Sequence, residues 1–326
     1  MIKIAIVGFG TVGQGFAELL IRKKDEIERA VGKFRVTAIA DSKSSISGDF
    51  RLDDALKMKR ETGRLRDDVS AMEIVREAEY DILIEASVTK VGGGDGVEYI
   101  REALRRGKHV ITSNKGPIVA DFDGLMKLAE RNGVKLMYEA TVGGAMPVIK
   151  LARKYLALCQ IESVKGILNG TCNYILSRME EEKLPYEQIL KEAQELGYAE
   201  ADPTYDVEGI DAALKLVIIA NTIGVKARYE DVEVTGITQI TPEAFEVAAG
   251  KGYTIRLIAE VSREKLKVSP RLVPLHHPLS IKGTMNAAMF KTDTAGNIFV
   301  AGRGAGKEET ASAILSDFYE IYAGSR

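Results

Sequence analysis

The 326-residue chain contains no tryptophan, two cysteines and three histidines. Two cysteines, Cys159 and Cys172, are too few for a disulfide framework, which indicates a reducing compartment. Together with three histidines they also offer too few ligands for us to expect a structural zinc site. The chain is therefore expected to fold by burying apolar surface, without disulfide or zinc crosslinks.

A charge excess and a long apolar run are missing as well. The 45 Lys and Arg residues nearly balance the 47 Asp and Glu residues, whereas nucleic-acid binders normally carry a basic excess. In the apolar stretch 211–224 the purely apolar run covers residues 216–220, far short of the ~20 residues of a membrane span. The first residues lack the zones of a signal peptide. We expect no nucleic acid or membrane as partner, and a cytoplasmic location.

The length suggests about two domains at ~150 residues each, and the first half alternates strand-like and helical patterns. Such alternation predicts α/β architecture with a doubly wound parallel Rossmann sheet. Residues 42–62 are charged and irregular and are assigned only weakly. The strands are expected at 3–7, 35–40, 81–86, 109–112 and 134–138, and the helices at 12–30, 71–78, 97–106 and 122–132.

From about residue 140 helical patterns come first and strands follow, which predicts a second domain of the α+β class. A glycine-rich turn, 302–306, then leads into a last amphipathic helix. The expected helices are 147–158, 173–182, 186–197 and 207–224, and the expected strands are 254–261, 267–273 and 286–290.

The first strand runs directly into the glycine-rich sequence GFGTVGQG at residues 8–15. In this fingerprint Gly8 makes the tight turn, Gly10 lets the backbone approach a pyrophosphate, and Gly13 lets helix and strand pack closely. The following helix offers free N–H groups to the phosphates. We expect dinucleotide binding here, against the alternative of a plain strand-to-helix turn.

The coenzyme preference stays open at the end of the second strand. Asp41 is placed to bond the ribose 2′-hydroxyl of NAD, yet Lys43 follows and is suited to the 2′-phosphate of NADP. The turn 302–306 lacks the spacing of a phosphate-binding P-loop, so we exclude an NTPase. This turn either only starts the last helix or also lines the coenzyme.

Asp211 and Lys215 stand four residues apart on the helix expected at 207–224, so both share one face. The residues around Lys215 are apolar on nearly all sides, which is the mark of a buried helix. A buried ammonium is costly unless it is paired, and such lysines often transfer protons. The alternative is an exposed ion pair on the protein surface, which contributes little to stability.

Three further segments carry candidate groups. The acidic loop 197–206 either captures a substrate ammonium or is a solvated loop in which Asp206 caps a helix. Lys115 follows a parallel strand, where ligands bind in such sheets, unless it is an ordinary loop lysine. Cys172 has no histidine near it in sequence to activate it, so we do not expect a cysteine nucleophile.

Six segments, in order along nearly the whole chain, together resemble homoserine dehydrogenase. The 197–216 segment is far more specific than the glycine fingerprint. The segments are GFGTVGQG (8–15), TSNKGP (112–117), YEATVGGAMPVI (138–149), GILNGTCNYIL (166–176), GYAEADPTYDVEGIDAALKL (197–216) and GRGAGKEETASA (302–313).

The resemblance implies reversible hydride transfer between L-homoserine and L-aspartate 4-semialdehyde, with NAD or NADP, in threonine and methionine biosynthesis. It implies that Lys215 donates the proton, that Asp211 helps to hold the substrate and that Lys115 lies near nicotinamide and substrate. The substrate-binding residues it implies are Glu200, Asp206, Thr171 and Tyr198. The coenzyme-binding residues are Gly8, Phe9, Gly10, Thr11, Val12, Gly13, Asp41, Lys43, Ser87, Ser113, Lys115 and Gly306.

The resemblance further implies a monovalent cation, sodium or potassium, bound by Glu139 and the carbonyls of Val142, Gly144 and Met146. It divides the chain into a dinucleotide-binding domain, 1–138 plus 302–326, and a substrate and dimerisation domain, 139–301. We expect a homodimer, and no kinase or regulatory domain in a chain of this length. The glycine-rich loop 88–96 is either a flap near the nicotinamide or a slack loop.

Two other functions stay open. The chain is alternatively another amino-acid-pathway NAD(P) reductase, or a dinucleotide sensor that has lost its chemistry. The two lysines, Lys115 and Lys215, argue against the sensor, because a sensor does not need an ammonium inside an apolar helix.

Overall fold

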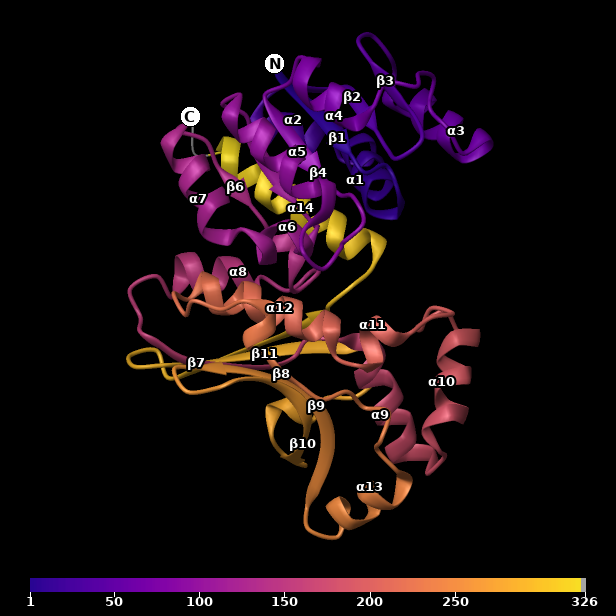
Figure 1. Ribbon diagram of the computed structural model, residues 1–326, viewed down its shortest axis with the longest axis vertical. Coiled ribbons are helices and arrows are strands. Elements are labelled where there is room, and N and C mark those ends of the chain that lie inside the picture. The colour runs from indigo at the N-terminus through magenta and orange to yellow at the C-terminus, as the bar shows by residue number, and fades with distance from the viewer. Residues whose placement is uncertain (324–326) are drawn as a thin grey trace. The chain divides into compact units, whose positions relative to one another are not determined.

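The structure is a computed structural model that describes residues 1–323. The chain forms two compact units. Unit 1 comprises residues 1–141 together with the segment that begins at Gly306, and unit 2 comprises residues 142–305. The last helix therefore belongs to the unit that contains the N-terminus (Figure 1).

Unit 1 is built on a six-stranded sheet with the order β3-β2-β1-β4-β5-β6. Its strands are parallel except for β3, which pairs antiparallel with β2 at the edge. The doubly wound Rossmann fold is thus confirmed, with an antiparallel edge strand in the weakly assigned segment. The strands are β1 (Ile2–Val7), β2 (Phe34–Ala40), β3 (Ser45–Ser47), β4 (Ile82–Glu85), β5 (His109–Thr112) and β6 (Leu136–Met137).

The helices of unit 1 depart from the sequence expectation in three places. The helix expected at 12–30 is two helices that meet at Lys23. The weakly assigned segment 42–62 contains a helix as well as β3, and a short helix begins at Lys115. The helices are α1 (Thr11–Arg22), α2 (Lys24–Val31), α3 (Leu52–Thr62), α4 (Ala71–Glu77), α5 (Gly94–Arg105), α6 (Lys115–Ala120), α7 (Phe122–Arg131), η1 (Glu139–Thr141) and α14 (Lys307–Tyr322).

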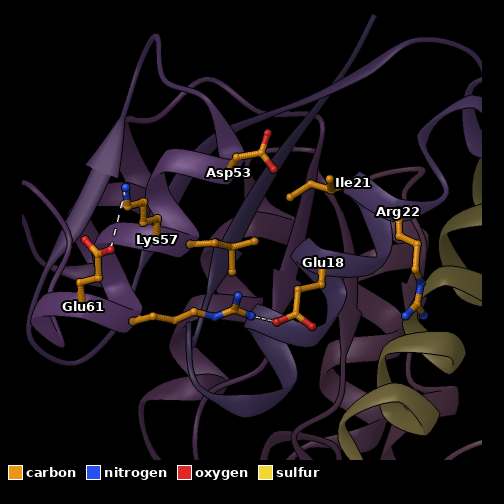
Figure 2. Close-up of a pocket in the computed structure, with 8 residues that line it drawn as sticks. Glu18, Ile21, Arg22, Asp53, Lys57 and Glu61 are labelled. Carbon is orange, nitrogen blue, oxygen red and sulfur yellow. Dashed lines mark ion pairs between the residues drawn. The ribbon is translucent and has the colours of Figure 1, made fainter.

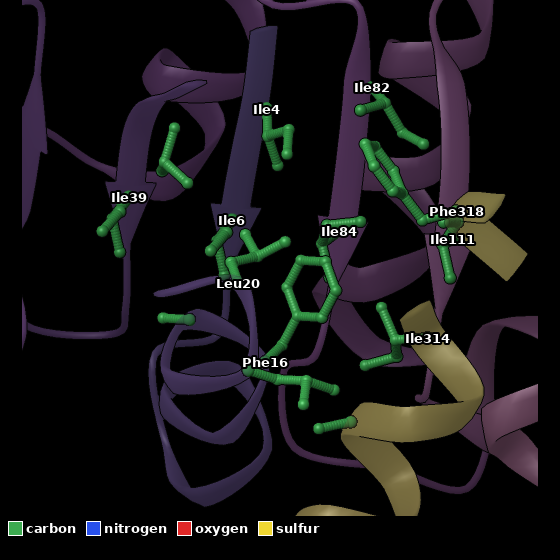
Figure 3. Close-up of a cluster of buried hydrophobic side chains, with 14 of the residues drawn as sticks. Ile4, Ile6, Phe16, Leu20, Ile39, Ile82, Ile84, Ile111, Ile314 and Phe318 are labelled. Atoms are coloured by element: carbon green, nitrogen blue, oxygen red, sulfur yellow. The ribbon is translucent and has the colours of Figure 1, made fainter. Parts of the chain in front are cut away.

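The core of unit 1 joins the two ends of the chain. Side chains of β1, β2, β4 and β5 meet those of α1 and α14 in one buried cluster, in which Phe16 faces Ile314 and the sheet (Figure 3). Phe318 on α14 is fully buried and packs edge-on against Phe34. Because burial of apolar surface dominates folding free energy, the last helix is part of the core.

Unit 2 contains a second six-stranded sheet, with the order β12-β11-β7-β9-β10-β8. Its pairings are antiparallel except for β8 with β10. The α+β class of this unit is confirmed, although the sequence patterns missed the three strands β7, β8 and β12. The strands are β7 (Ile161–Ile167), β8 (Glu233–Val234), β9 (Tyr253–Ser262), β10 (Leu266–Pro274), β11 (Met285–Thr292) and β12 (Asn297–Arg303).

The helices of unit 2 include the one that carries Asp211 and Lys215. It begins at Ile210, three residues later than expected, because Gly209 adopts a left-handed conformation with φ of +81° and separates it from a short preceding turn of helix. In the segment expected as a helix at 147–158, helical residues cover only 148–155, and residues 151–155 of these form a π-helix. The helices are α8 (Val148–Lys150), η2 (Leu151–Tyr155), α9 (Gly170–Glu182), α10 (Tyr186–Glu195), α11 (Thr204–Val207), α12 (Ile210–Thr222), η3 (Tyr229–Asp231), α13 (Pro242–Ala249) and η4 (Pro278–Ser280).

Among residues 1–323, no helix has the length and apolar character that crossing a membrane requires. The same range holds no group of three or more His, Cys, Asp or Glu side chains arranged for a metal ion.

The position of Phe318 predicts a large loss of stability on truncation. We expect Phe318→Ala to lower the free energy of unfolding by about 3–5 kcal/mol, because it removes a fully buried ring from the core. Tyr319→Ala, at the next residue and with a side chain 55% exposed, is the matched control and should change it by less than about 1 kcal/mol. Denaturant unfolding measures both, and equal losses would show that α14 is not part of the core.

Candidate active site

The glycine fingerprint forms a cradle that is open on one side. A Cβ atom added to Gly8 would lie 2.2 Å from the carbonyl carbon of Ala86, and one added to Gly13 would lie 2.2 Å from the Gly8 oxygen. At Gly10 nothing lies within 4 Å. The first and third glycines are thus needed for packing, and the second leaves the space that a pyrophosphate needs.

The remaining residues of this segment have different roles in the structure. Thr11 is exposed at the first turn of α1, and Val12 is half-buried. Phe9 is fully buried in the core of unit 1. The Phe9 side chain therefore anchors the turn, and only its backbone is left for a coenzyme.

Asp41 at the end of β2 is engaged by the protein itself. Its Oδ1 accepts the backbone N–H groups of Lys43 at 2.8 Å and Ser44 at 3.0 Å. Its Oδ2 lies 2.7 Å from Nζ of Lys59, and both side chains are largely buried. Lys59 was not identified from the sequence, because nothing in the irregular segment indicated that α3 would bring it to Asp41.

The loops after β4 and β5 hold the other coenzyme-binding candidates. Ser87 and Ser113 are half-buried, and the Ser113 N–H donates to the carbonyl of Glu85 at 3.1 Å. Lys115 is the half-buried first residue of α6. All three lie at the carboxyl ends of parallel strands, the edge at which such sheets bind ligands.

In unit 2 the structure brings Asp211 and Lys215 into direct contact, as their spacing predicted. Lys215 Nζ lies 2.7 Å from Asp211 Oδ2 and donates to the Leu168 carbonyl at 2.7 Å. The two residues are only 7% and 6% exposed. The pair is thus buried, and its contribution to stability is not the small one of a solvent-exposed ion pair.

Asn169 links this pair to a second carboxylate. Its Nδ2 donates to Asp211 Oδ2 at 2.9 Å and to Asp206 Oδ1 at 2.6 Å, while its Oδ1 caps α9 by accepting the Cys172 N–H. Burial and the nearby Asp211 raise the pKa of the Asp206 carboxyl, and the bond from Asn169 lowers it. The only signal for Asn169 in the sequence is a weak one, an asparagine at a helix start, where it can serve as the N-cap.

Three predicted substrate-binding residues lie near the start of α9 and in the loop that follows α10. The Thr171 hydroxyl donates to the Tyr198 carbonyl at 2.9 Å. The Tyr198 ring is 47% exposed and lies 4.6 Å from that of Tyr174. Glu200 is exposed in the same loop, and its carbonyl accepts from Gln194. Asp206 belongs to α11 and does not cap α12.

Cys172 is fully buried beneath this network. Its Sγ donates to the Asp206 carbonyl at 3.1 Å. Burial and the charges of Asp206 and Asp211 raise the thiol pKa well above its ordinary value. A buried thiol that stays protonated is not a nucleophile, which agrees with the sequence expectation.

The residues predicted to hold a cation and the C-terminal turn are also placed. Glu139 is 3% exposed and its N–H donates to Asp317 at 3.0 Å. In unit 2, Val142, Gly144 and Met146 are buried, and Gly144 has φ of +54°. The Met146 carbonyl accepts the Val148 N–H at 2.9 Å. Gly306 is exposed at the start of α14, with φ of +136°.

A surface pocket between α1 and α3 is a competing location for a ligand (Figure 2). Its charged side chains all have charged partners. Glu18 contacts Arg60 and Lys307, and Lys57 contacts Glu61. Arg22 contacts Glu308 on α14, and Asp53 contacts Arg51. Paired charges on an exposed surface offer little to an anionic or cationic ligand. The glycine turn and the Lys215 network are the stronger candidates.

Together these features support oxidoreduction of a small polar substrate. The cradle at Gly8–Gly13 fits a dinucleotide, and a buried ammonium can stabilise negative charge on an oxygen and exchange a proton with it.

Comparison with known proteins agrees. The family model for homoserine dehydrogenase matches residues 147–319, and the model for the homoserine dehydrogenase NAD-binding domain matches residues 8–139. A homoserine dehydrogenase of Methanocaldococcus jannaschii is 46% identical over 98% of both chains. A crystal structure from Archaeoglobus fulgidus, provisionally named homoserine dehydrogenase, is 85% identical, covers 99% of this chain and 100% of its own, and has a TM-score of 0.97. A hyperthermophilic archaeal homoserine dehydrogenase in complex with NADPH is 32% identical, with a TM-score of 0.87 and coverage of 100% and 98%.

The burial of Cys172 predicts selective thiol labelling. At neutral pH iodoacetamide should modify the half-buried Cys159 and leave Cys172 unmodified, because the raised pKa keeps the Cys172 thiol protonated until strongly alkaline pH. In denaturant both should react. Peptide mass spectrometry measures the two sites, and rapid modification of Cys172 in the folded protein would contradict its assignment as a structural residue.

Proposed function

The chain belongs to the homoserine dehydrogenase family of NAD(P)-dependent oxidoreductases, and we propose that Lys215 is the residue that exchanges a proton with the substrate oxygen in its reaction. One observation carries this proposal. The Lys215 ammonium is buried, and two of its three N–H donors are taken by Asp211 and Leu168. The third remains for a substrate oxygen.

The charge balance around Lys215 supports this role. A carbonyl oxygen that receives a hydride on its carbon becomes negative, and a nearby ammonium both stabilises that charge and supplies the proton. In the reverse direction the neutral amine accepts the proton of the hydroxyl. Asp211 stabilises the ammonium form, and the Leu168 carbonyl fixes the direction of Nζ.

The substrate amino group needs a carboxylate partner, and the network offers two. Asp206 is held by Asn169 at 2.6 Å, whereas Glu200 lies exposed in the loop before α11. We assign the amino group to Glu200, with Asp206, Thr171 and Tyr198 completing the site. An exposed carboxylate is free to turn toward a ligand, while Asp206 is already fixed.

The coenzyme site is assigned to unit 1. The backbone of residues 8–13 would hold the pyrophosphate, with Gly306 beside it, and the loops that carry Ser87, Ser113 and Lys115 would hold the nicotinamide end. When bound, the nicotinamide supplies the hydride chemistry. Lys115 then contributes positive charge to this end of the site.

We further propose that the chain accepts NADP(H). The Asp41 carboxylate, which in an NAD-specific site would bond the ribose, is neutralised by Lys59 at 2.7 Å. Lys43 is exposed on the same turn, and Arg64 donates to the Lys43 carbonyl at 2.9 Å. This basic surrounding suits a 2′-phosphate, and the archaeal relative described above was solved with NADPH.

Two further assignments concern a bound ion and the assembly of the chain. Glu139 and the backbone carbonyls of Val142, Gly144 and Met146 are hard oxygen donors of the kind that suits sodium or potassium, and we propose that these residues bind such an ion. We also keep the homodimer, with residues 139–301 as the substrate and dimerisation domain and 1–138 plus 302–326 as the coenzyme domain. The support for a homodimer is exposed apolar surface on the sheet of unit 2, where Leu272 on β10 is 57% exposed and Phe299 on β12 is 38% exposed. Helices α9 and α12 contact the same sheet.

Replacement of Lys215 tests the proposed proton transfer. We expect Lys215→Met to lower kcat for homoserine oxidation by about 10²–10⁴-fold, because the apolar stem stays and the proton acceptor is lost. The readout is the initial rate of NAD(P)⁺ reduction. The control Lys226→Ala, an exposed lysine close to the end of α12, should keep the full rate. A Lys215→Met protein that is folded, binds coenzyme and oxidises homoserine normally would refute the role.

Replacement of Lys59 tests the coenzyme assignment. Lys59→Ala should raise the KM for NADP⁺ by about tenfold relative to that for NAD⁺, because it removes one charge partner and leaves Asp41 to repel the 2′-phosphate. Lys57→Ala, on the same helix and paired with Glu61, is the matched control and should leave the ratio of the two KM values unchanged. An unchanged ratio in Lys59→Ala would exclude Lys59 from this site.

A further inference from the structure

Glu85 is a fully buried carboxyl group at the carboxyl ends of the parallel strands, where the coenzyme site is assigned. It is the last residue of β4 and is 0% exposed. The strand residues before it are Ile82, Leu83 and Ile84, all buried. A carboxyl group in such surroundings is costly unless its oxygens are hydrogen-bonded. The mechanism proposed above does not use it.

Four donors converge on this carboxyl group, from the loop after β4, from the last residue of β5 and from the loop after β5. The Ser87 N–H at 3.0 Å, the Ser87 hydroxyl and the Asn114 amide at 3.4 Å donate to Oε1. The Thr112 hydroxyl donates to Oε2 at 2.7 Å. A carboxylate is an acceptor only, so the ionised form satisfies all four donors. The pKa of Glu85 lies above its ordinary value because burial raises it by more than the bonds from Ser87, Thr112 and Asn114 lower it.

The same network fixes the start of α6. The Thr112 hydroxyl also accepts the Asn114 N–H at 3.0 Å, and the Asn114 Oδ1 caps the helix by accepting the Gly116 N–H at 3.1 Å. Lys115 is the first residue of this helix. The position of the Lys115 backbone therefore depends on Asn114, and that of the Asn114 amide depends on Glu85.

Close backbone contacts tie the glycine-rich loop and α5 to this network. A Cβ atom on Gly96 would lie 2.8 Å from the Asn114 amide nitrogen and 3.4 Å from Glu85 Oε1. A Cβ atom on Gly116 would lie 2.4 Å from the Lys90 carbonyl oxygen. The loop 88–96 is thus packed against α6, and all of these segments surround one carboxylate.

From this geometry we infer that Glu85 is a positioning residue for the nicotinamide half of the coenzyme. Its carboxylate links the loop after β4, which carries Ser87, to the loop after β5, which carries Ser113 and Lys115, and holds both in one arrangement. The inference rests on the proposed placement of the nicotinamide at these two loops. It assigns no contact between Glu85 and the coenzyme.

The test compares two ligands that share the adenosine and pyrophosphate parts. In Glu85→Gln one side of the carboxamide is an NH₂ group that faces donors, so the two loops lose their common anchor. By calorimetric titration we expect its affinity for NADPH to fall by about tenfold or more, on the scale of one or two hydrogen bonds. Its affinity for 2′-phospho-ADP-ribose, which lacks the nicotinamide, should stay within about twofold of the wild-type value.

Two further variants make the result decisive. Glu73→Gln, in the exposed capping box of α4, makes the same change elsewhere in unit 1 and should bind both ligands normally, because glutamine also serves in a capping box. Thr112→Val removes the donor to Oε2 together with the acceptor of the Asn114 N–H, and leaves the bonds to Oε1 in place. It should show the same selective loss in smaller degree, which keeps the test valid if Glu85→Gln does not fold.

Normal NADPH affinity in both Glu85→Gln and Thr112→Val would overturn the inference. So would a parallel loss of both ligands, since that is the result of general damage to unit 1. A wild-type chain that binds 2′-phospho-ADP-ribose but not NADPH would instead refute the proposed nicotinamide site, and is therefore distinguishable.

Discussion

The contact between the Lys215 ammonium and the Asp211 carboxylate is the constraint on which the active-site region depends. Burying a charge on an apolar helix carries a large desolvation penalty, unless an oppositely charged partner and a hydrogen-bond acceptor are in place. Asp211 supplies the first and the Leu168 carbonyl the second. The start of α9, the end of β7 and the N-terminal turn of α12 are therefore fixed relative to one another by one positive charge.

The same principle operates in unit 1 with a carboxyl group in place of the ammonium. Glu85 is a buried carboxyl group that gathers hydroxyl and amide donors, whereas Lys215 is a buried ammonium that gathers oxygen acceptors. In unit 1 the loops after β4 and β5 are held by hydrogen bonds to the Glu85 carboxyl group. In unit 2 the Leu168 carbonyl, directly after β7, is held by a hydrogen bond from Lys215 on α12. Rigid support of this kind positions functional groups more precisely than loop packing alone.

The coenzyme-binding turn and the Asp211–Lys215 pair could be predicted from the sequence, because each depends on residues that are close together along the chain. The glycines at 8, 10 and 13 follow a strand and open a helix, and the i,i+4 spacing of Asp211 and Lys215 requires one face. What the sequence did not show depends on contacts between distant segments. Asn169, Lys59 and Glu85 have ordinary neighbours in sequence, and their roles appear only when β7, α3 and β4 are folded. The start of α12 was misplaced because the left-handed conformation of Gly209 is not visible in an apolar pattern.

The discontinuity of unit 1 has a consequence for the order in which the chain can fold during synthesis. The strands and helices up to Thr141 leave the ribosome first, but their core lacks Ile314 and Phe318 until α14 has been made. Unit 2 is continuous, and its last residue is made before that helix. Residues 1–141 therefore keep part of their apolar surface uncovered while unit 2 is synthesised and completes its own core. Domains usually fold from the N-terminus onward during translation, and here the final closure of the first unit comes last.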